Sequence, residues 1–600
     1  MPQYSVDSRT IENVIGYIKD GQISIPEIQR PFVWDGAKIR DLIDSLYHGY
    51  PVGYLIVWQN PNMKDKQGET SIGKKIMIDG QQRVTALMTA IVGMKVLDKD
   101  FKEKVHKIAF NPFAEEGESP FEVQDAAILK NKRWIPDISV LFNTDFDQFS
   151  FIEDFSAANP EMPRKELNAL INKVTSIKNA PIGIINLNEA LNIDEVTEIF
   201  IRINSKGKAL TQADFVMSTI AADEAHGGNM LRKAIDYFCH LAQSSEFLKQ
   251  IEKDQKFVYS EYFDIIKWYA KVEHTIFTPS FDDLIRTAFM SRYYRGKLAN
   301  LTDLLHGRNF ETRAYEEVIM AETFDQFKEG TKEYMDKYVL TQFIEAIKSA
   351  GFVFRRLVRG RMAMNFAYML FIRLRHNSSI DKLKINHYIQ KWYVMSVLTS
   401  RYGASPETQM DRDLRAIKDK GFLQFYNEVM ANLGEDFWNV TLPQNLQSSS
   451  NTAPAFIVFL AAQCKTNSDS FLSNGSKVRD LLEGADIHHL FPKQYLQDNG
   501  IDATIRYNQI ANYAVLSKPV NIAIGKKAPN VYMHEIYEAC KKCEDSHYTT
   551  INNLEDLEAN CRTNCIPPSF CDMTAKDYDT FLEMRRHLMA KKIKDYFESL

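Results

Sequence analysis

Two neighbouring histidines near the C-terminus, His488 and His489, are the residues best suited to chemistry in this sequence. Around them runs Asp486-Ile487-His488-His489-Leu490-Phe491-Pro492, followed by Asn512-Tyr513-Ala514-Val515-Leu516 and then by Asn521. Imidazole ionises near neutral pH, so a histidine can deprotonate the water that attacks a phosphodiester. A divalent cation beside it offsets the charge that builds on the phosphoryl oxygens. The pattern therefore predicts a metal-dependent phosphodiesterase site.

Two short strands and a helix are needed to position these groups. The sequence predicts a strand through the histidine pair, a turn, a second strand after Asn512 and a helix carrying Asn521 nine residues later, which is a ββα-metal arrangement. Neighbouring side chains on a strand point to opposite faces, so the two histidines have different roles unless the strand is bent. We assign His489 as the general base, and His488 and Asn521 as ligands of Mg²⁺ or Mn²⁺. Asn512 is expected to fix the loop and to orient His489 by a hydrogen bond.

A second group of polar residues lies in the first 225 residues. Ile78-Asp79-Gly80-Gln81-Gln82-Arg83 stands where a short strand, Lys75 to Ile78, stops and a helix begins near Arg83. Glycine lets backbone N–H groups approach an anion, a helix N-terminus favours negative charge, and arginine makes forked contacts to phosphate. Asp79 is suited to holding a metal or positioning a water. The alternative for Asp79-Gly80 is a type I′ hairpin turn.

Two further segments carry cationic and amide side chains. One contains Gln29-Arg30-Pro31 and the other contains Arg202-Ile203-Asn204 beside a glycine turn at Ser205 to Lys208. The alternative for Arg202 and Asn204 is the exposed end of a surface helix. The sequence has no Gly-rich loop ending in Gly-Lys-Ser/Thr, so a nucleotide site here is not of the P-loop class.

The C-terminal motif resembles the His-Asn-His/Asn (HNH) nucleases. The run from His488 to Pro529 resembles the HNH domain of GmrSD-type restriction enzymes. The N-terminal segments resemble the ParB/sulfiredoxin-like domain of the same enzymes, which bears the sequence DGQQR. The matching segments are Gln29-Arg30-Pro31, Tyr50-Pro51-Val52-Gly53, Asp79 to Arg83, and Phe200 to Gly207.

This resemblance implies that the N-terminal domain binds and hydrolyses a nucleoside triphosphate (GTP, UTP, CTP or ATP). It also implies that hydrolysis is coupled to the cutting of modified phage DNA. The nucleotide would be handled by a set of seven side chains: Asp79 as a catalytic residue, with Arg30, Gln81, Gln82, Arg83, Arg202 and Asn204 as binding residues.

The pattern along the chain predicts an α+β protein with several domains. Residues 1–225 are expected to form the ParB-like α/β nucleotide-binding domain. Residues 226–440 are expected to form a mostly helical connecting region, and residues 441–600 the ββα-metal (HNH) domain. The polar segment Leu442 to Thr452 is interpreted as a linker or an exposed loop.

The composition is that of a soluble globular protein, with 45% apolar and 25% charged residues. A net charge of -5 does not by itself indicate nucleic-acid binding, although a locally positive groove can exist on an acidic protein. The sequence shows no signal peptide and no apolar stretch long enough to span a bilayer. We therefore expect a cytoplasmic protein without a membrane partner.

Two weaker signals remain. Cys540, Cys543, Cys561 and Cys565 have a spacing that permits a four-thiolate zinc site, but both pairs lie in helix-like sequence and Cys571 adds a fifth thiol. The stretch Lys348 to Ser379 contains no acidic residue and six arginines (Arg355, Arg356, Arg359, Arg361, Arg373 and Arg375). It is interpreted either as a DNA-backbone surface or as two amphipathic helices with solvated arginines.

Taken together, the sequence predicts a modification-dependent (type IV-like) DNA endonuclease of anti-phage defence, regulated by its nucleotide site. A homodimer would place two HNH sites for double-strand cleavage. One alternative is a nucleotide-gated DNA-binding regulator with a decayed nuclease. Another is an RNA-directed nuclease such as a toxin.

Overall fold

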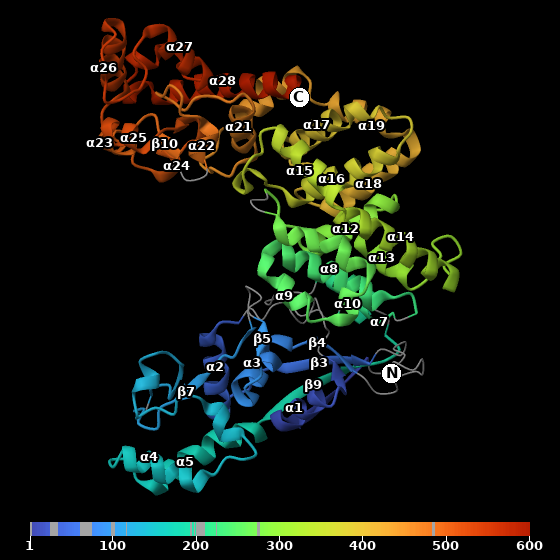
Figure 1. Cartoon of the computed structure of the whole chain (residues 1–600). Helices are drawn as coiled ribbons and strands as arrows, with labels where there is room; N and C mark the ends of the chain where they lie inside the picture. The colour runs from blue at the N-terminus through green and yellow to red at the C-terminus, as the bar shows by residue number, and fades with distance from the viewer. Residues whose placement is uncertain are drawn as a thin grey trace. The chain divides into compact units, whose positions relative to one another are not determined.

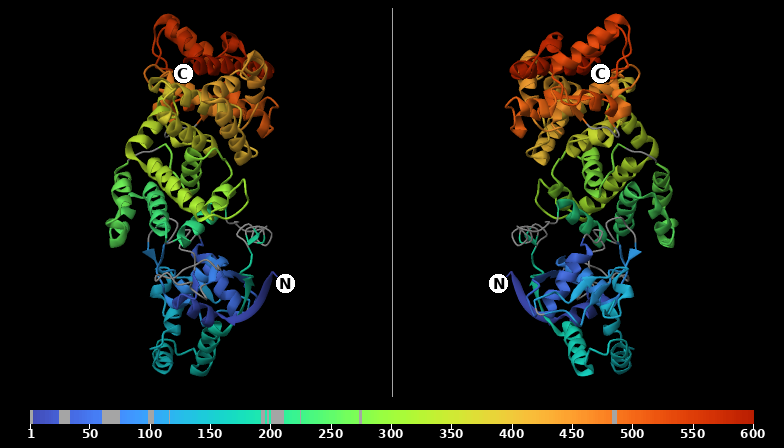
Figure 2. Two further views of the ribbon diagram at one scale, coloured as in Figure 1. Left: turned by 90° about the vertical axis from the view of Figure 1, so that its right-hand side faces the viewer. Right: turned by 90° about the vertical axis from the view of Figure 1, so that its left-hand side faces the viewer.

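The chain forms two compact units, Met1–Val258 and Tyr259–Leu600. The computed structural model describes residues 3–24, 34–59, 75–97, 103–115, 117–191, 195–196, 199, 211–223, 225–272, 276–482 and 487–600. Figures 1 and 2 show both units from several sides. The three domains expected from the sequence have boundaries after residues 225 and 440, whereas this division has one boundary, after residue 258.

A five-stranded sheet in the order β1-β9-β3-β4-β2 organises unit 1. Its strands are β1 (Tyr4–Thr10), β2 (Ile23–Ser24), β3 (Tyr54–Gln59), β4 (Lys75–Asp79) and β9 (Pro181–Leu187). The β1–β9 and β3–β4 pairs are antiparallel, while β3–β9 and β2–β4 are parallel. The sheet is thus mixed, and its parallel pairs require crossover connections.

Both faces of this sheet are covered, as the near-continuous apolar run of β3 requires. Leu55 and Val57 belong to the same buried cluster as the apolar residues of helices α1 (Ile11–Lys19), α2 (Gly36–Tyr47) and α3 (Gln81–Val92). On the other face, Ile56, Trp58 and Ile78 form a smaller cluster with Leu187 and Leu191. Alternation along β3 therefore sends successive side chains into two cores.

The remaining elements of unit 1 are short strands and helices. They are β5 (Val96–Leu97), β6 (Glu103–Lys104), β7 (Ile108–Phe110), β8 (Phe121–Val123), η1 (Ile128–Lys130), η2 (Ile138–Phe142), α4 (Gln148–Ala158), α5 (Arg164–Thr175), η3 (Ser176–Asn179), α7 (Gln212–Ala222), α8 (Gly228–Gln243), η4 (Ser245–Phe247), α9 (Leu248–Ile251) and α10 (Gln255–Val258). The sequence Thr211-Gln212-Ala213-Asp214 has the spacing of a capping box, and Thr211 and Asp214 form that box at the start of α7.

Unit 2 is almost entirely helical in its described residues. Its elements up to residue 482 are α11 (Glu261–Ile266), η5 (Lys267–Lys271), α12 (Phe281–Arg292), α13 (Leu298–Leu305), α14 (Glu317–Met335), α15 (Lys337–Ser349), η6 (Arg355–Leu357), α16 (Arg361–His376), η7 (Lys382–Lys384), α17 (Ile385–Leu398), α18 (Pro406–Lys420), α19 (Phe422–Met430), η8 (Phe437–Thr441), α20 (Leu442–Asn445), α21 (Pro454–Lys465) and α22 (Val478–Leu482). Helix α16 is buried along most of its length and packs between α12 and α17.

The last part of unit 2 holds the only strands described there. In chain order it contains β10 (Ile487–His489), α23 (Lys493–Asp498), α24 (Thr504–Tyr507), η9 (Ile510–Asn512), β11 (Tyr513–Val515), α25 (Lys518–Ile524), α26 (Pro529–Lys542), α27 (Leu554–Thr563), η10 (Pro568–Asp572), η11 (Ala575–Asp577) and α28 (Tyr578–Ser599). Helix α28 also packs on α20 and α21, and Tyr596 donates a hydrogen bond to the carbonyl of Ala350. This module is therefore continuous with the helices that precede it.

The segment interpreted as a linker is partly structured. Leu442 and Pro443 are buried in α20, Leu446 is buried as well, and the Ser448 carbonyl accepts a hydrogen bond from the backbone of Ile510. Gln444 and Asn445 are exposed between these buried residues, and most residues after Leu446 are exposed as well. The polar composition of Ser448 to Thr452 is that of a loop. The buried residues Leu442 and Leu446 hold the chain before that loop, and the Ser448 carbonyl connects it to the segment that precedes β11. None of the helices in the described ranges is both long and apolar enough to cross a membrane.

Candidate functional site

His489 lies on a two-stranded antiparallel ribbon. Strand β10 pairs with β11 so that His489 faces Tyr513 and His488 faces Ala514. Directly paired residues share a face of a ribbon, and neighbours alternate. His489 therefore lies on the face of Tyr513, and His488 on the opposite one. Helix α25 follows β11. Between β10 and β11, where the sequence predicts a turn, the chain instead forms α23, α24 and η9.

Asn512 fixes the loop after His489 from a fully buried position. Its Oδ1 accepts a hydrogen bond from the Phe491 N–H at 2.8 Å. Its Nδ2 donates to the carbonyls of Phe491 at 3.1 Å and Tyr507 at 3.2 Å. The backbone carbonyl of Asn512 accepts from the Leu490 N–H at 2.8 Å. Since each bond is to backbone, the side chain holds together the two segments that flank the site.

The expected hydrogen bond from Asn512 to His489 is not the one that the structure shows. Instead, Nε2 of His489 lies 2.9 Å from Oδ1 of Asn508. The amide of Asn512 is already used by the backbone, so the ring is oriented by an asparagine four residues earlier. Burial lowers the pKa of His489, while the bond to Asn508 opposes that shift and the charges of His488 and Lys493 add to it. The ring is thus favoured in the neutral form that can accept a proton.

Side chains from later helices pin the backbone of the site. Tyr532 of α26 donates to the Leu490 carbonyl at 2.9 Å. Tyr578 of α28 donates to the Tyr507 carbonyl at 3.2 Å. Arg585 of α28, only 1% exposed, donates to the carbonyls of Ala511 at 2.8 Å and Tyr513 at 2.6 Å. Burial lowers the pKa of Arg585 to about 10. A guanidinium in the core therefore serves as an anchor for β11.

The two predicted metal ligands, His488 and Asn521, come from β10 and α25 and are both half-buried. Among the described residues, no group of three or more His, Cys, Asp or Glu side chains is placed to hold a metal ion. An imidazole and an amide could bind a cation that keeps water and substrate oxygens as its other ligands, as Mg²⁺ does in phosphate chemistry. Asp486, which precedes the strand, lies outside the described residues.

A cavity of about 390 Å³ opens beside the base. Ile487, His489 and Tyr513 line it from the ribbon, and Asn451, Thr452, Ile457 and Leu460 line it from α21 and the loop before that helix. Two arginines from far away in the sequence, Arg356 and Arg359, complete the lining. The position of Arg356 and Arg359 beside His489 could not be predicted from the spacing of residues in the sequence. The arginine-rich composition of their segment was the one signal that pointed to them.

The Asp79-Gly80 pair joins a strand to a helix. Gly80 has φ 98° and precedes α3, so the strand-to-helix transition predicted there is confirmed and the hairpin alternative is wrong. A side chain at Gly80 would place its Cβ 2.4 Å from Cδ2 of Leu55. The left-handed φ and the close approach both require glycine. Asp79 and the first residues of α3 are half-buried at the end of β4.

Two side chains of this segment are bonded to the backbone of their own unit. Arg83 donates from Nη1 to the Tyr54 carbonyl at 2.8 Å, and burial lowers its pKa although Asp79 opposes the shift. Gln81 donates from Nε2 to the Met77 carbonyl at 3.2 Å. Arginine has five N–H donors, so one such bond leaves others for an anion. Contact of these side chains, or of half-buried Gln82, with a nucleotide stays a prediction.

Comparison with known proteins supports the assignment of this region. Residues 11–221 match the sequence model of the family described as "GmrSD restriction endonuclease, N-terminal domain". The N-terminal region thus matches a GmrSD-type domain. An uncharacterized protein of Methanocaldococcus jannaschii is 21% identical over 645 residues, which cover 98% of this chain and 99% of that protein. Both units are therefore represented in that relative.

Several predicted residues of the GmrSD-type domain lie outside the described residues. These are Arg30, Arg202 and Asn204. Their roles in nucleotide binding stay predictions.

The cysteines proposed for zinc have individual contacts. The Cys540 thiol donates to the Ile551 carbonyl and the Cys565 thiol to the Leu588 carbonyl. Burial raises the pKa of Cys561 to about 12 and also raises that of Cys565. Because zinc binds thiolates, burial of this kind works against a site at Cys540, Cys543, Cys561 and Cys565.

Proposed function

We propose that this chain is a DNA endonuclease that cleaves phosphodiesters at the His489 site. Membership of residues 11–221 in a restriction endonuclease domain family supports a nuclease with DNA as its substrate. The observation that carries the proposal is the pairing of β10 with β11, followed by α25, with His489 facing a cavity that two arginines also line. This order of elements is the one expected of an HNH site.

In this proposal His489 accepts a proton from the attacking water. Asn508 holds the imidazole through Nε2, so the proton would be taken at Nδ1, and the tautomer is set by the Asn508 bond. Asn512 keeps the following loop in place without touching the ring. His488 and Asn521 would hold Mg²⁺ or Mn²⁺, which would stabilise the charge on the phosphoryl oxygens.

The N-terminal domain is proposed to bind and hydrolyse a nucleoside triphosphate and so to regulate cutting. Support comes from Gly80 in left-handed conformation at the start of α3, where backbone N–H groups suit an anion. Asp79 stands beside that turn and has the chemistry to hold a cation or orient a water. Dependence on a DNA modification rests on the family and on the sequence resemblance alone.

Cleavage of matched unmodified and modified phage DNA tests the proposal. The full chain is assayed with Mg²⁺ or Mn²⁺, with and without each of the four nucleotides. His489→Ala is expected to abolish cutting while DNA binding and nucleotide hydrolysis persist. His534→Ala is the matched control, because it removes an exposed imidazole from α26 of the same unit. Cutting that survives in His489→Ala would refute the site.

The nucleotide site has its own assay. Asp79→Ala is expected to suppress triphosphate hydrolysis, whereas Asp20→Ala, which removes an exposed carboxylate of the same unit, is not. Unchanged turnover in Asp79→Ala would place that chemistry elsewhere. Hydrolysis and DNA binding without cutting under any condition would favour the nucleotide-gated regulator. Preferential cutting of RNA would favour the toxin-like nuclease.

A further inference from the structure

The six arginines between Lys348 and Ser379 have different environments. Three of them, all on α16, bond to residues of α12 or α15. Arg361 pairs with buried Asp283 at 2.9 Å, Arg373 donates to the Met290 carbonyl and stacks on Tyr294, and Arg375 donates to Gln342. The other three, Arg355, Arg356 and Arg359, form no ion pair with any carboxylate in the described parts of the chain.

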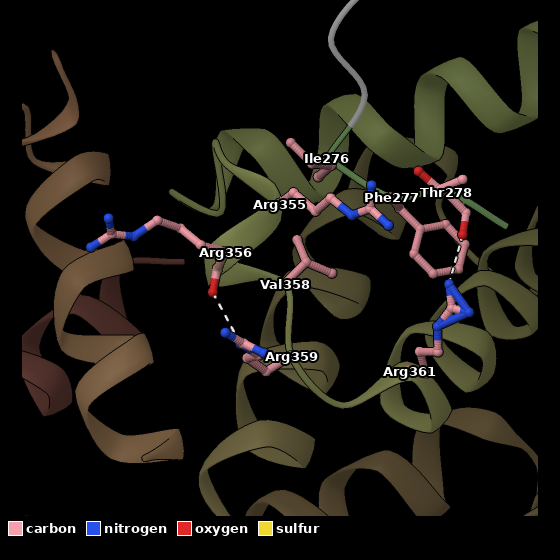
Figure 3. A pocket seen from close by; sticks show the side chains of 8 residues that line it. All are labelled: Ile276, Phe277, Thr278, Arg355, Arg356, Val358, Arg359 and Arg361. Carbon is pink, nitrogen blue, oxygen red and sulfur yellow. Dashed lines mark hydrogen bonds between the residues drawn. The ribbon is translucent and has the colours of Figure 1, made fainter. Parts of the chain in front are cut away.

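These three arginines do not lie on amphipathic helices. Arg355 and Arg356 belong to the short turn η6, and Arg359 lies in the irregular stretch before α16. Arg355 and Arg359 are exposed, and Arg356 is half-buried. With three residues per turn in a 3₁₀ helix, the side chains of Arg355 and Arg356 leave η6 in different directions. In Figure 3, Arg356 extends away from Arg355 and Arg361, toward the helix at the left of the view.

Two cavities meet at Arg356 and Arg359. The first, of about 420 Å³, is lined by all the arginines of this stretch up to Arg361 and by Ile276, Phe277 and Thr278 (Figure 3). The second, of about 390 Å³, contains His489 and Tyr513. Because Arg356 and Arg359 line both, cationic side chains extend from Arg355 to the cavity that contains the candidate base.

The local electrostatics favour an anion in this path. Arg356 is anchored through Nη1 to the Leu482 carbonyl at 2.7 Å, and Nε of Arg359 donates to the Arg356 carbonyl at 3.2 Å. The hydrogen bond between them keeps the two arginines close. Burial lowers the pKa of Arg356, and the positive charge of Arg359 adds to that shift. Like charges fixed in a partly enclosed space are stabilised by a bound anion. Guanidinium matches phosphate in charge and in hydrogen-bond geometry.

We propose that Arg355, Arg356 and Arg359 bind consecutive phosphates of the DNA strand that enters the His489 cavity. The ligand is a phosphodiester backbone, because the arginines offer charge and N–H donors, and phosphate contacts position a nucleic acid without reading its sequence. This inference rests on the proposed function, since it names the surface that delivers substrate to that site. The three arginines are positioning residues.

DNA binding by the full chain tests the path. Fluorescence anisotropy of a short labelled duplex is measured with EDTA in the His489→Ala background, across salt concentrations of about 50 to 200 mM. Arg355→Gln with Arg359→Gln is expected to weaken binding roughly tenfold and to lower the slope of log affinity against log salt by about 2, because each lost phosphate contact removes about 0.9. Arg356 is left intact because it also anchors Leu482.

Two matched variants distinguish charge from structure. Arg562→Gln removes an exposed arginine of α27, which lines neither cavity, and is expected to leave affinity and salt slope unchanged. Arg355→Lys with Arg359→Lys keeps both charges and is expected to restore most of the salt slope. If Arg355→Gln with Arg359→Gln binds the duplex with the same affinity and salt slope as Arg562→Gln, the inference is overturned. So would tighter binding of an RNA duplex of the same sequence.

Failure of this inference is distinguishable from failure of the proposed function. If the glutamine pair binds DNA normally but His489→Ala abolishes cutting, the nuclease site stands and the path is wrong. If the glutamine pair loses affinity but His489→Ala still cuts, the path stands and the base is wrong.

Discussion

The segment around His489 in unit 2 and the segment around Asp79 in unit 1 are held in place in different ways. At His489, the anchors are residues distant in the chain from the histidine pair, such as Asn512, Tyr532 and Arg585, and they bond to backbone. At Asp79, two residues of the motif itself, Gln81 and Arg83, bond to the backbone of β4 and of the residue that begins β3. The first arrangement leaves the imidazole directed to a cavity. The second gives motif side chains a structural role.

The comparison shows that the side chains of a short motif can serve chemistry in one region and stabilise the local fold in another. Mutation can separate these two roles. If the comparison is right, unit 2 should be sensitive to changes far from its motif. Unit 1 should be sensitive to changes within its motif, whether or not a nucleotide is present.

The largest effect is expected from Arg585→Ala. The change removes hydrogen bonds to Ala511, Tyr513 and Asn564 and leaves buried carbonyls unsatisfied beside a cavity. We expect the free energy of unfolding of unit 2 to fall by about 3–5 kcal/mol. The loss is measured by the hydrogen exchange of backbone amides in peptides that contain β11. Lys591→Ala, an exposed change on the same helix, should have almost no effect. Equal protection in the two variants would contradict the anchoring role.

A smaller loss, of about 2 kcal/mol, is expected from Gly80→Ala in unit 1. The new Cβ meets Leu55, and a left-handed φ costs about 1 kcal/mol or more for a residue with a side chain. Gly49→Ala is the control, because Gly49 has φ 74° with no atom within 4 Å of its Cβ position. Urea unfolding of unit 1 should show a clearly greater loss for Gly80→Ala. Identical midpoints would mean that Leu55 moves aside.

Asn508→Ala separates positioning from stability at the His489 site. The change removes the hydrogen bond to Nε2 but leaves the Asn512 bonds intact. We expect a 10- to 100-fold drop in the cleavage rate, typical of lost partners that orient catalytic groups, with stability changed by at most about 1 kcal/mol. The readout is kcat against KM for DNA cutting. Asn508→Asp, which keeps an acceptor, should recover part of kcat. A change in KM alone would contradict the positioning role.

The smallest effect concerns His240 on α8 of unit 1. Burial lowers its pKa below the ordinary 6.5, the nearby Asp236 opposes this shift, and the positive charge of Arg232 adds to it. The unfolded chain therefore binds a proton that the folded chain excludes, and unit 1 loses stability as pH falls below about 6.5. The slope contributed is at most about 1.4 kcal/mol per pH unit. Urea midpoints between pH 7 and pH 5 should fall less in His240→Gln. An unchanged pH slope would refute this contribution.

Local sequence was enough to place most elements around the N-terminal motif. Apolar spacing predicts helices over Thr10 to Lys19 and Trp34 to Tyr47, where α1 and α2 lie. It also predicts strands over Val52 to Trp58, Lys75 to Ile78 and Ala180 to Leu187, where β3, β4 and β9 lie. Strand β1 was missed, because it is an edge strand whose side chains are mostly exposed and carry little apolar pattern. The capping box at Thr211 was predictable, because its bonds join residues three apart.

The sequence by itself determined which residue types could do chemistry and that two strands and a later helix carry them, but not the helices α23 and α24 between the strands. Those features depend on bonds and periodicities within a few residues. Only the tertiary structure decided that Asn508, and not Asn512, bonds to His489, since the burial of Asn512 commits its amide to backbone. Only the tertiary structure brought Arg356 and Arg359 to the same cavity as His489. The physical reason is that η6 packs on α21 and Arg356 bonds to the Leu482 carbonyl, which joins segments whose separation in the chain carries no local signal.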